Sequence, residues 1–353
     1  LSLDTASSLG SASETTSSKD YSKTNIQVEN VDEADITKTD GDYIYSISEN
    51  NVIITDVRDP GNIKIAKTIT ENDESYPEDL ILYNDKLITI SSTSSSSYNK
   101  YLSNTIVRVY DITNKSNPLI LKEFELIEPY YTSRCIGNKL YVIASGRLRE
   151  NDDKIDTYYI EDNTRKEMQL GSIKYLDDIK TNKQTLISTV NLDNINEDIN
   201  LTSYLIDISN AYVSENNIYL VDEEYKYNDY VPPISSLFTL KGAIGPFIYE
   251  YDEDRGYETK IYKFSILEDG NVRYDVNTNT KGKIINQYSL DESNAHLRIA
   301  LYDSDGSRIE IFDEKLNKIG ESEPVAKGET MYSSRCIGDK VYFVTYKTMD
   351  PLF

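Results

Sequence analysis

The sequence predicts an all-β protein built from repeated units of four short antiparallel strands, and two observations support this. The first is a ten-residue stretch, Ser133–Val142, which returns almost unchanged much later in the chain as Ser334–Phe343. Both copies read Ser-Arg-Cys-Ile-Gly, followed by a polar residue, a lysine and an apolar, aromatic run. Internal repetition of a β-type unit indicates a repeat architecture.

The second observation is that each copy has the pattern of a β-hairpin. The turn residues Gly137-Asn138 and Gly338-Asp339 tolerate the positive φ that two-residue hairpin turns require. The residues after each turn have high strand propensity. Weaker copies of the same hairpin supply four further predicted strands, at 43–47, 86–90, 218–221 and 296–299.

Two more strands follow most of these hairpins. The predicted strands are 51–56, 63–69, 105–112, 119–126 and 308–313, and turn signals such as Asp59-Pro60-Gly61 separate them. Each compact unit is therefore four short antiparallel strands, which is the content of a β-propeller blade.

These landmarks predict a β-propeller in which blades occupy 34–77, 78–128, 129–207, 208–285 and 286–328, with an incomplete blade at 329–353. Long insertions interrupt the third and fourth blades at 149–182 and 225–258. A propeller closes on itself, because an open stack leaves strand edges exposed. We therefore expect this chain to be the N-terminal portion, about five and a half blades, of a longer propeller.

One segment resembles the signature of a known family. Residues 24–41, TNIQVENVDEADITKTDG, look like the opening of a family of secreted β-propeller proteins of archaea and bacteria, distantly related to WD-repeat propellers. Residues 286–300 and 332–353 are similar to further patterns of that family, so the resemblance runs from about residue 22 to the end of the chain. It implies an extracytoplasmic propeller that continues through more blades. The family's biochemical role is not established, and the pattern supplies no catalytic residue.

The composition disfavours nucleic acid and anionic membranes as partners. The chain has 60 acidic and 37 basic residues, a formal net charge of −23, and such a field repels phosphate groups. The same charge would keep the surface soluble, or attract cations, cationic polymers or calcium. The chain has 30 tyrosines and no tryptophan, and tyrosines pack between sheets or form platforms for sugars and peptides. We expect no cofactor, with calcium as the one candidate metal.

The first 23 residues are expected to be a disordered tether, since they are dominated by serine and threonine. They contain no apolar signal sequence or spanning helix. A stalk of this kind typically follows a secretion or lipoprotein signal that has been removed. Either such a segment has been removed, which the composition of the stalk favours, or the protein is cytosolic. We therefore expect an extracellular protein, or one anchored at the cell surface through that missing segment.

The two cysteines are predicted to be buried free thiols. Cys135 and Cys336 occupy equivalent positions of the third and sixth units. Equivalent points three blades apart lie on opposite sides of the propeller axis, whereas a disulfide needs Cα atoms within about 7 Å. Two thiols and one histidine, His296, also fall short of a tetrahedral metal set.

The candidate binding residues are charged side chains at matching or opening positions of the repeats. They are Asp32, Glu33, Asp35, Arg134 and Arg335. The acidic run at 32–35 is read either as turn chemistry that helps ring closure or as a cation site. Both arginines lie on predicted inner strands, where they could pair with these carboxylates across or around the channel.

Other motifs carry less chemistry. His296 lies in an alternating strand, which favours a packing role over catalysis, and no nucleophile-elbow sequence accompanies it. Asp303–Gly306 lacks the later ligands of a calcium loop, so a hairpin turn is the better interpretation.

Two classes of function remain. One is a noncatalytic binding or scaffold module that recognises a protein or glycan with its faces and insertions. The other is an extracellular glycan lyase or hydrolase with carboxylates at the channel mouth, for which paired carboxylates about 5–10 Å apart would be the mark. The sequence leaves open whether Asp35, Asp207 and Asp222 converge.

The segment at 25–31 alternates apolar and polar residues like a half-buried strand. We expect it to lie poorly paired at the open edge, or to be borrowed by the incomplete sixth blade near 341–346.

Overall fold

The computed structural model describes residues 26–71, 75–97, 100–151, 154–155, 157–176, 181–226 and 256–347. Most of these residues are in strands, and the helical segments among them are two 3-10 turns, η1 (Leu170–Ser172) and η3 (Gln287–Ser289). The prediction of an all-β protein is confirmed. The predicted tether at 1–23 and most of the 225–258 insertion lie outside the described residues.

Three sheets each contain four antiparallel strands that follow one another along the chain. They consist of β2 (Thr37–Thr39), β3 (Tyr43–Ser48), β4 (Asn51–Asp56) and β5 (Lys64–Thr70); of β19 (Asn210–Val213), β20 (Asn217–Lys226), β21 (Gly256–Ile266) and β22 (Val272–Lys281); and of β23 (Leu290–Ser293), β24 (His296–Asp303), β25 (Gly306–Phe312) and β26 (Lys318–Glu321).

Two further sheets have six strands, because each adds strands from elsewhere. One contains β6 (Ser75–Tyr83), β7 (Lys86–Ser97), β8 (Lys100–Asp111) and β9 (Leu119–Leu126), extended by β14 (Tyr158–Glu161) and β15 (Thr164–Glu167). The other contains β1 (Val31–Glu33), β10 (Tyr130–Ile136), β11 (Lys139–Arg147), β17 (Lys183–Asn191), β18 (Asn200–Tyr204) and β16 (Ile173–Lys174). Smaller two-stranded sheets are formed by β12 (Glu150–Asn151) with β13 (Lys154–Ile155) and by β27 (Thr330–Ile337) with β28 (Lys340–Tyr346).

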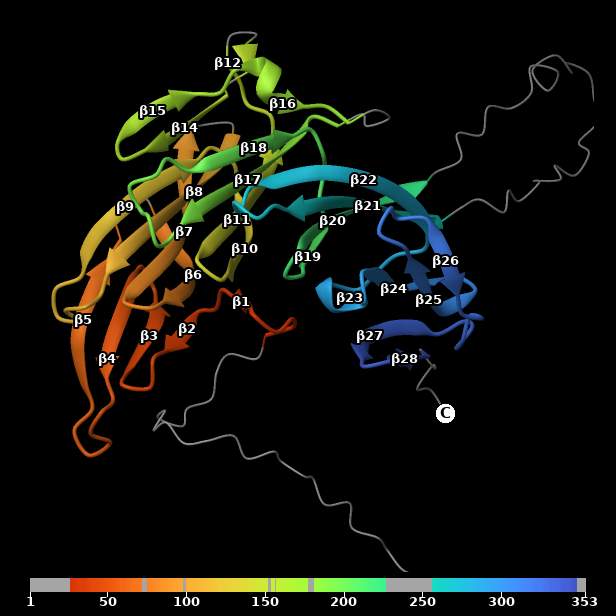
Figure 1. Cartoon of the computed structure of the whole chain (residues 1–353), viewed down its shortest axis with the longest axis horizontal. Helices are drawn as coiled ribbons and strands as arrows, with labels where there is room; N and C mark the ends of the chain where they lie inside the picture. The colour runs from red at the N-terminus through yellow and green to blue at the C-terminus, as the bar shows by residue number, and fades with distance from the viewer. Residues whose placement is uncertain are drawn as a thin grey trace, which may run out of the picture.

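Apolar side chains join each large sheet to the next one along the chain. Tyr45 and Ile54 of the β2–β5 sheet pack against Leu87 of β7. The three following interfaces are equivalent and contain, in order, Ile88 with Val142, Ile143 with Phe264, and Val221 with Ile299. The sheets follow one another around an arc in Figure 1, from β5 to β28. Full burial of one such side chain contributes about 1.5–3 kcal/mol, so these interfaces form the core.

Strands between two neighbouring sheets are apolar on both faces. The middle of β11 is buried at five successive residues from Leu140, whereas β4 alternates buried and half-buried residues. The sequence shows the same difference, since a strand covered on both faces needs an unbroken apolar run.

The repeated turns adopt the predicted backbone. Gly137 and Gly338 have φ of 55° and 58°, and the corresponding turn residues Asn84 and Asn294 have φ of 49° and 51°. Glycine and asparagine are the residues that enter this left-handed region at the lowest cost.

Part of the 149–182 insertion extends a neighbouring sheet. Strand β14 pairs antiparallel with β9, where Tyr159 lies opposite Leu126. The carboxylate of Glu161 accepts from Lys122 of β9 at 2.6 Å and from Lys166 at 2.7 Å, and Glu161 and Lys122 are both buried. The hairpin therefore covers the edge of β9, which would otherwise present unpaired backbone groups to other chains.

The N-terminal segment corrects the prediction made for residues 25–31. Asn25 lies outside the described residues. Val31–Glu33 form β1, which pairs antiparallel with β10 rather than with β28 or an open edge. The prediction of a half-buried strand at 25–31 is wrong, because residues 27–30 form bends and turns and only Val31 of this segment belongs to β1. Val31 is buried in the core cluster that contains Tyr141 of β11.

Both cysteines are unpaired, as predicted, and they lie on β10 and β27. Cys135 is buried, but Cys336 is only half-buried, so the prediction of two buried thiols is wrong for Cys336. The β27–β28 sheet has two strands, and most of its residues are half-buried or exposed.

The close contact at Gly146 gives a test of this packing. A β-carbon at position 146 would lie 2.6 Å from Cδ of Pro129 and would also meet the carboxylate of Glu128. We expect Gly146→Ala to lower the free energy of unfolding by about 1–3 kcal/mol, measured by urea denaturation. Gly171→Ala is the control, because a β-carbon there meets no atom within 4 Å. Equal stabilities of the two variants would contradict the packing described here.

Candidate functional site

The N-terminal segment brings five sheets into contact. Besides the pairing of β1 with β10, the Gln27 amide donates to the backbone oxygens of Gln287 at 3.1 Å and Leu290 at 3.0 Å. The Asn30 amide donates to Glu215, in the turn between β19 and β20, at 2.7 Å. Asp35 forms an isolated antiparallel bridge with Leu80 of β6.

Asp32 completes these contacts by accepting from Lys38 of β2 at 2.9 Å. The Lys38 side chain is only 4% exposed, so its charge depends on this partner and on the Glu33 carbonyl. The segment at 26–35 is called the axial segment below.

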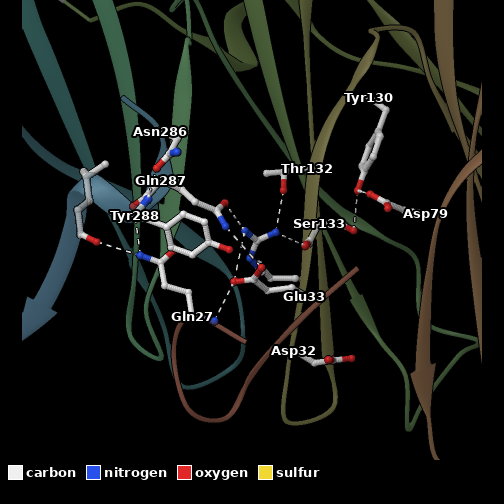
Figure 2. Close-up of polar contacts among 12 residues, drawn as sticks. Gln27, Asp32, Glu33, Asp79, Tyr130, Thr132, Ser133, Asn286, Gln287 and Tyr288 are labelled. Carbon is white, nitrogen blue, oxygen red and sulfur yellow. Dashed lines mark hydrogen bonds and ion pairs between the residues drawn. The ribbon is translucent and has the colours of Figure 1, made fainter. Parts of the chain in front are cut away.

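Arg134 of β10 lies at the centre of a polar network beside the axial segment. Its guanidinium is buried and lies 3.9 Å from the carboxylate of Glu33, which is the residue opposite it in the β1–β10 register. The Arg134 side chain also donates to Thr132 Oγ1 and the Ser133 carbonyl, each at 2.7 Å, and to Gln287 Oε1 at 2.9 Å. Figure 2 shows Gln27 and Glu33 of the axial segment lying close to Gln287 of η3.

The network fixes the orientation of Gln287. Its Oε1 accepts from Arg134, and its Nε2 therefore points toward Glu33 Oε2, at 3.5 Å. The backbone N–H of Gln27 donates to the other carboxylate oxygen of Glu33 at 3.2 Å. Arg134 and Glu33, which were candidates from the sequence, thus lie together in a polar network that links β1, β10 and η3.

Arg335, the counterpart of Arg134 in the repeat, is placed differently. Its guanidinium lies over the ring of Tyr288, 4.6 Å from the ring centroid, and its side chain is exposed. Within the described residues it forms no ion pair with Asp32, Glu33 or Asp35. The sequence suggested such a pair for both arginines, but only β10 receives β1 as a neighbour.

A cavity of about 890 Å³ lies beside the axial segment. It is lined by the ends of β2, β6 and β10 and by the axial segment itself; the lining residues are Ile26, Glu29, Asn30, Asp32, Asp35, Thr37, Lys38, Thr39, Asp40, Leu82, Tyr83, Asn84, Cys135 and Gly137. Burial raises the pKa of the Cys135 thiol to about 12, so it stays protonated and is a poor nucleophile at neutral pH. Asp32 and Asp35 therefore share a cavity, while Glu33 faces Arg134.

A second buried pair was not predicted from the sequence. The Tyr130 hydroxyl donates to Asp79 at 2.6 Å and lies 2.9 Å from Ser133 Oγ (Figure 2). Burial raises the pKa of Asp79, and the nearby carboxylates of Glu78 and Asp35 add to this effect. The repeat marks Ser133 but not Tyr130, whose counterpart is Met331, and Asp79 belongs to another strand, so no signal for this pair was present in the sequence.

Of the three aspartates considered for a carboxylate pair, two interact. Burial raises the pKa of Asp222 to about 6, and the neighbouring charges of Asp207 and Glu224 contribute. Asp207 itself accepts from Lys183 at 2.7 Å. Asp35 is not part of this group.

Glu128, two residues before β10, is a buried acid whose pKa lies far above the ordinary carboxyl value. Its side chain is 1% exposed, and its Oε1 has no hydrogen-bond partner. Burial raises its pKa to about 8, and only the charge of Arg149 opposes this shift. Glu128 is thus mainly neutral at pH 7.

The remaining motifs have local roles. His296 begins β24 and its Nδ1 lies 2.7 Å from the Asn294 carbonyl, so it contacts the turn rather than a core or a reacting group. Asp303 and Gly306 close the predicted hairpin turn between β24 and β25. In the described part of the chain, no group of three or more His, Cys, Asp or Glu side chains is arranged to hold a metal ion. The same residues contain no helix long and apolar enough to cross a membrane.

Comparison with known proteins establishes the family. A family model described as a beta propeller domain matches residues 21–353, and the chain therefore belongs to the beta propeller domain family. An uncharacterized protein of Methanocaldococcus jannaschii is 28% identical over 394 residues, which cover 94% of this chain and 59% of the relative. An uncharacterized protein of Archaeoglobus fulgidus is 24% identical over 408 residues, covering 96% of this chain and 62% of the relative. The chain thus spans about three fifths of the length of these curated relatives.

Solved structures show only distant likeness. The acylaminoacyl peptidase of Pyrococcus horikoshii has a TM-score of 0.38 at 13% identity, with 90% of this chain and 41% of that chain covered. A mutant of the Synechocystis apocarotenoid oxygenase has a TM-score of 0.34 at 9% identity, with 86% and 64% covered. We draw no argument from likenesses this weak.

The repeat provides a matched pair of variants that tests the polar network. We expect Arg134→Ala to lower the free energy of unfolding by about 3 kcal/mol, because it leaves Glu33 and three neutral acceptors without their buried donor. Arg335→Ala removes an exposed stacking contact and should cost less than about 1 kcal/mol. Urea denaturation of both variants measures the difference, and equal losses would refute the structural role of Arg134.

Glu128 predicts a defined dependence of stability on pH. Its folded-state pKa of about 8 lies above the ordinary value of 4.5, so the folded chain binds the proton more tightly. The stability contributed by this group is therefore complete below pH 4.5, falls as the pH rises toward 8, and is constant above it. Glu128→Gln stays neutral, so its stability relative to the original chain should rise by about 1 kcal/mol per pH unit in this window. Urea denaturation at pH 5, 7 and 9 measures this, and a pH-independent difference would rule it out.

Proposed function

We propose that this chain is a noncatalytic binding or scaffold module that works outside the cytoplasm, in the extracellular space or anchored at the cell surface. Its ligand is a protein or a glycan. Acidic composition and a leader rich in serine and threonine support this location, and they disfavour nucleic acid as a partner.

We also propose that the sheets are propeller blades of four strands, at 34–77, 78–128, 129–207, 208–285 and 286–328. The β27–β28 sheet is then the start of a sixth blade. Packing of each large sheet on the next one along the chain supports this division, as does the likeness of β10–β11 to β27–β28. In this account the chain is the N-terminal portion of a longer propeller.

The observation that carries the binding proposal is that charged side chains near the axial segment satisfy one another. Glu33 lies 3.9 Å from the Arg134 guanidinium, and Asp32 accepts from Lys38 at 2.9 Å. Asp32 and Lys38 line the larger cavity, and lining side chains that are held in place by such contacts lower the entropy lost on ligand binding. Carboxylates that are paired with a cation in this way are poorly suited to exchange protons with a substrate.

One observation favours the alternative, an extracellular glycan lyase or hydrolase. Asp222 has a pKa of about 6 and lies within the field of Asp207. A carboxyl group of this kind can act as a general acid near neutral pH.

A binding screen separates the two functions. The chain is applied to glycan and peptide arrays with calcium or with a chelator, and bound ligands are recovered for mass spectrometry. The binding module predicts ligands that are recovered unchanged, in equal amounts from the original chain and from Asp222→Asn. Cleaved ligand that disappears with Asp222→Asn would contradict the module and support the enzyme. The calcium arm tests the one metal that the acidic composition favours.

A further inference from the structure

A second cavity, of about 290 Å³, lies where three sheets begin. It is lined by Tyr131 and Thr132 of β10, Asn210 and Ala211 of β19, and Asn286, Gln287 and Tyr288 at η3. These residues come from three sheets that the axial segment connects. The volume is at the lower end of small-molecule sites, which begin near about 300 Å³, so the cavity suits one small ring.

The lining of this cavity is uncharged, although the chain carries a net charge of −23. The charges around it belong to residues outside the lining. Arg134 is compensated by Glu33 and by the acceptors Thr132 and Gln287. Arg335 lies over the Tyr288 ring, and the carboxylates of Glu223 and Asp207 act on Tyr131. A half-buried lining of amides, hydroxyls and aromatic rings suits neutral ligands better than ions, because an ion would lose part of its water without gaining a counter-charge from the lining.

Several polar groups of the lining have no partner in the described part of the chain. The hydroxyls of Tyr131 and Tyr288 and the amide of Asn210 make no side-chain hydrogen bond there, and all three residues are half-buried. Burial raises the pKa of Tyr131 to about 12, so its hydroxyl remains a donor at any physiological pH. In contrast, Gln287 is fixed in one orientation by Arg134 and Glu33. The cavity therefore combines one amide of fixed orientation with polar groups that make no side-chain hydrogen bond to the described part of the chain.

The backbone at Tyr131 turns its side chain out of the regular strand pattern. The β10–β11 register shifts between Tyr130 and Thr132, which is a β-bulge. Bulges re-aim side chains and interrupt the regular row of backbone groups along an edge. A peptide that binds by strand addition needs such a regular row, so the bulge favours a compact ligand over an extended peptide.

We propose that this cavity binds a single neutral sugar ring, as the terminal unit of a glycan. Sugar hydroxyls both donate and accept, which matches the amide of Asn210 and the hydroxyls of Tyr131 and Tyr288. The apolar C–H faces of a sugar ring pack on tyrosine rings. This inference rests on the proposed binding function and gives it a ligand class and a site.

The repeat again supplies a matched control for the test. The β27–β28 register has the same shift, between Met331 and Ser333, so Tyr332 is the bulged counterpart of Tyr131. Tyr332 is 70% exposed and does not line the cavity. The variants are Tyr131→Phe and Asn210→Ala, with Tyr332→Phe as the control. Thermal melting of each variant checks that it folds.

The probes are immobilised neutral hexose and N-acetylhexosamine oligosaccharides, sialylated and sulfated glycans, and neutral peptides. We expect neutral glycans to bind the original chain. Tyr131→Phe and Asn210→Ala should each weaken that binding by about three- to tenfold, the effect of losing one hydrogen bond. Tyr332→Phe should leave it unchanged.

Three results would overturn this inference. They are binding of charged glycans or peptides alone, neutral-glycan binding that the cavity variants leave intact, and a variant loss that Tyr332→Phe reproduces. In each of these the proposed binding function survives. If the chain binds none of the probes, both proposals fall.

Discussion

The position of the axial segment is the constraint on which the arrangement of the sheets depends. Each sheet forms mainly from strands that are neighbours in sequence, and such local pairing leaves the sheets' relative placement undefined. The axial segment pairs with β10 and also contacts Gln287, Glu215, Lys38 and Leu80, which belong to four other sheets or their connections. These contacts join residues far apart in the chain. Their closure entropy is offset only when several form together, so the segment couples the sheets.

The polar network around Arg134 shows how this coupling avoids an uncompensated charge. Burying a guanidinium costs several kcal/mol, and one carboxylate at 3.9 Å does not offset that cost by itself. The hydroxyl of Thr132, the carbonyl of Ser133 and the amide of Gln287 supply the other acceptors. Because these acceptors come from β10 and η3, the charge is satisfied only when β1, β10 and η3 are assembled. The same requirement orients Gln287 at the wall of the smaller cavity.

Local features were readable from the sequence, and long-range ones were not. Turn residues such as Gly137 and Asn84 have fixed backbone preferences, so the hairpins follow from short stretches of sequence. The partner of β1 does not follow in this way, because a three-residue strand with one buried apolar side chain fits any open sheet edge equally well. Nor does the repeat distinguish Arg134 from Arg335, whose local sequences agree while only one of them has β1 beside it. Tyr130 with Asp79, and the use of the 149–182 insertion to extend the β9 edge, likewise depend on which sheets become neighbours.

The central claim is that the axial segment couples the sheets, and one comparison of thermal melting tests it most directly. A chain that begins at residue 24 retains the axial segment, whereas a chain that begins at residue 36 lacks it. Calorimetry of both measures the melting temperature and the cooperativity of unfolding. This account predicts one cooperative transition for the longer chain, and a lower, broader or divided transition for the shorter one. A single transition at the same temperature in both chains would show that packing between the sheets suffices, and would contradict the account.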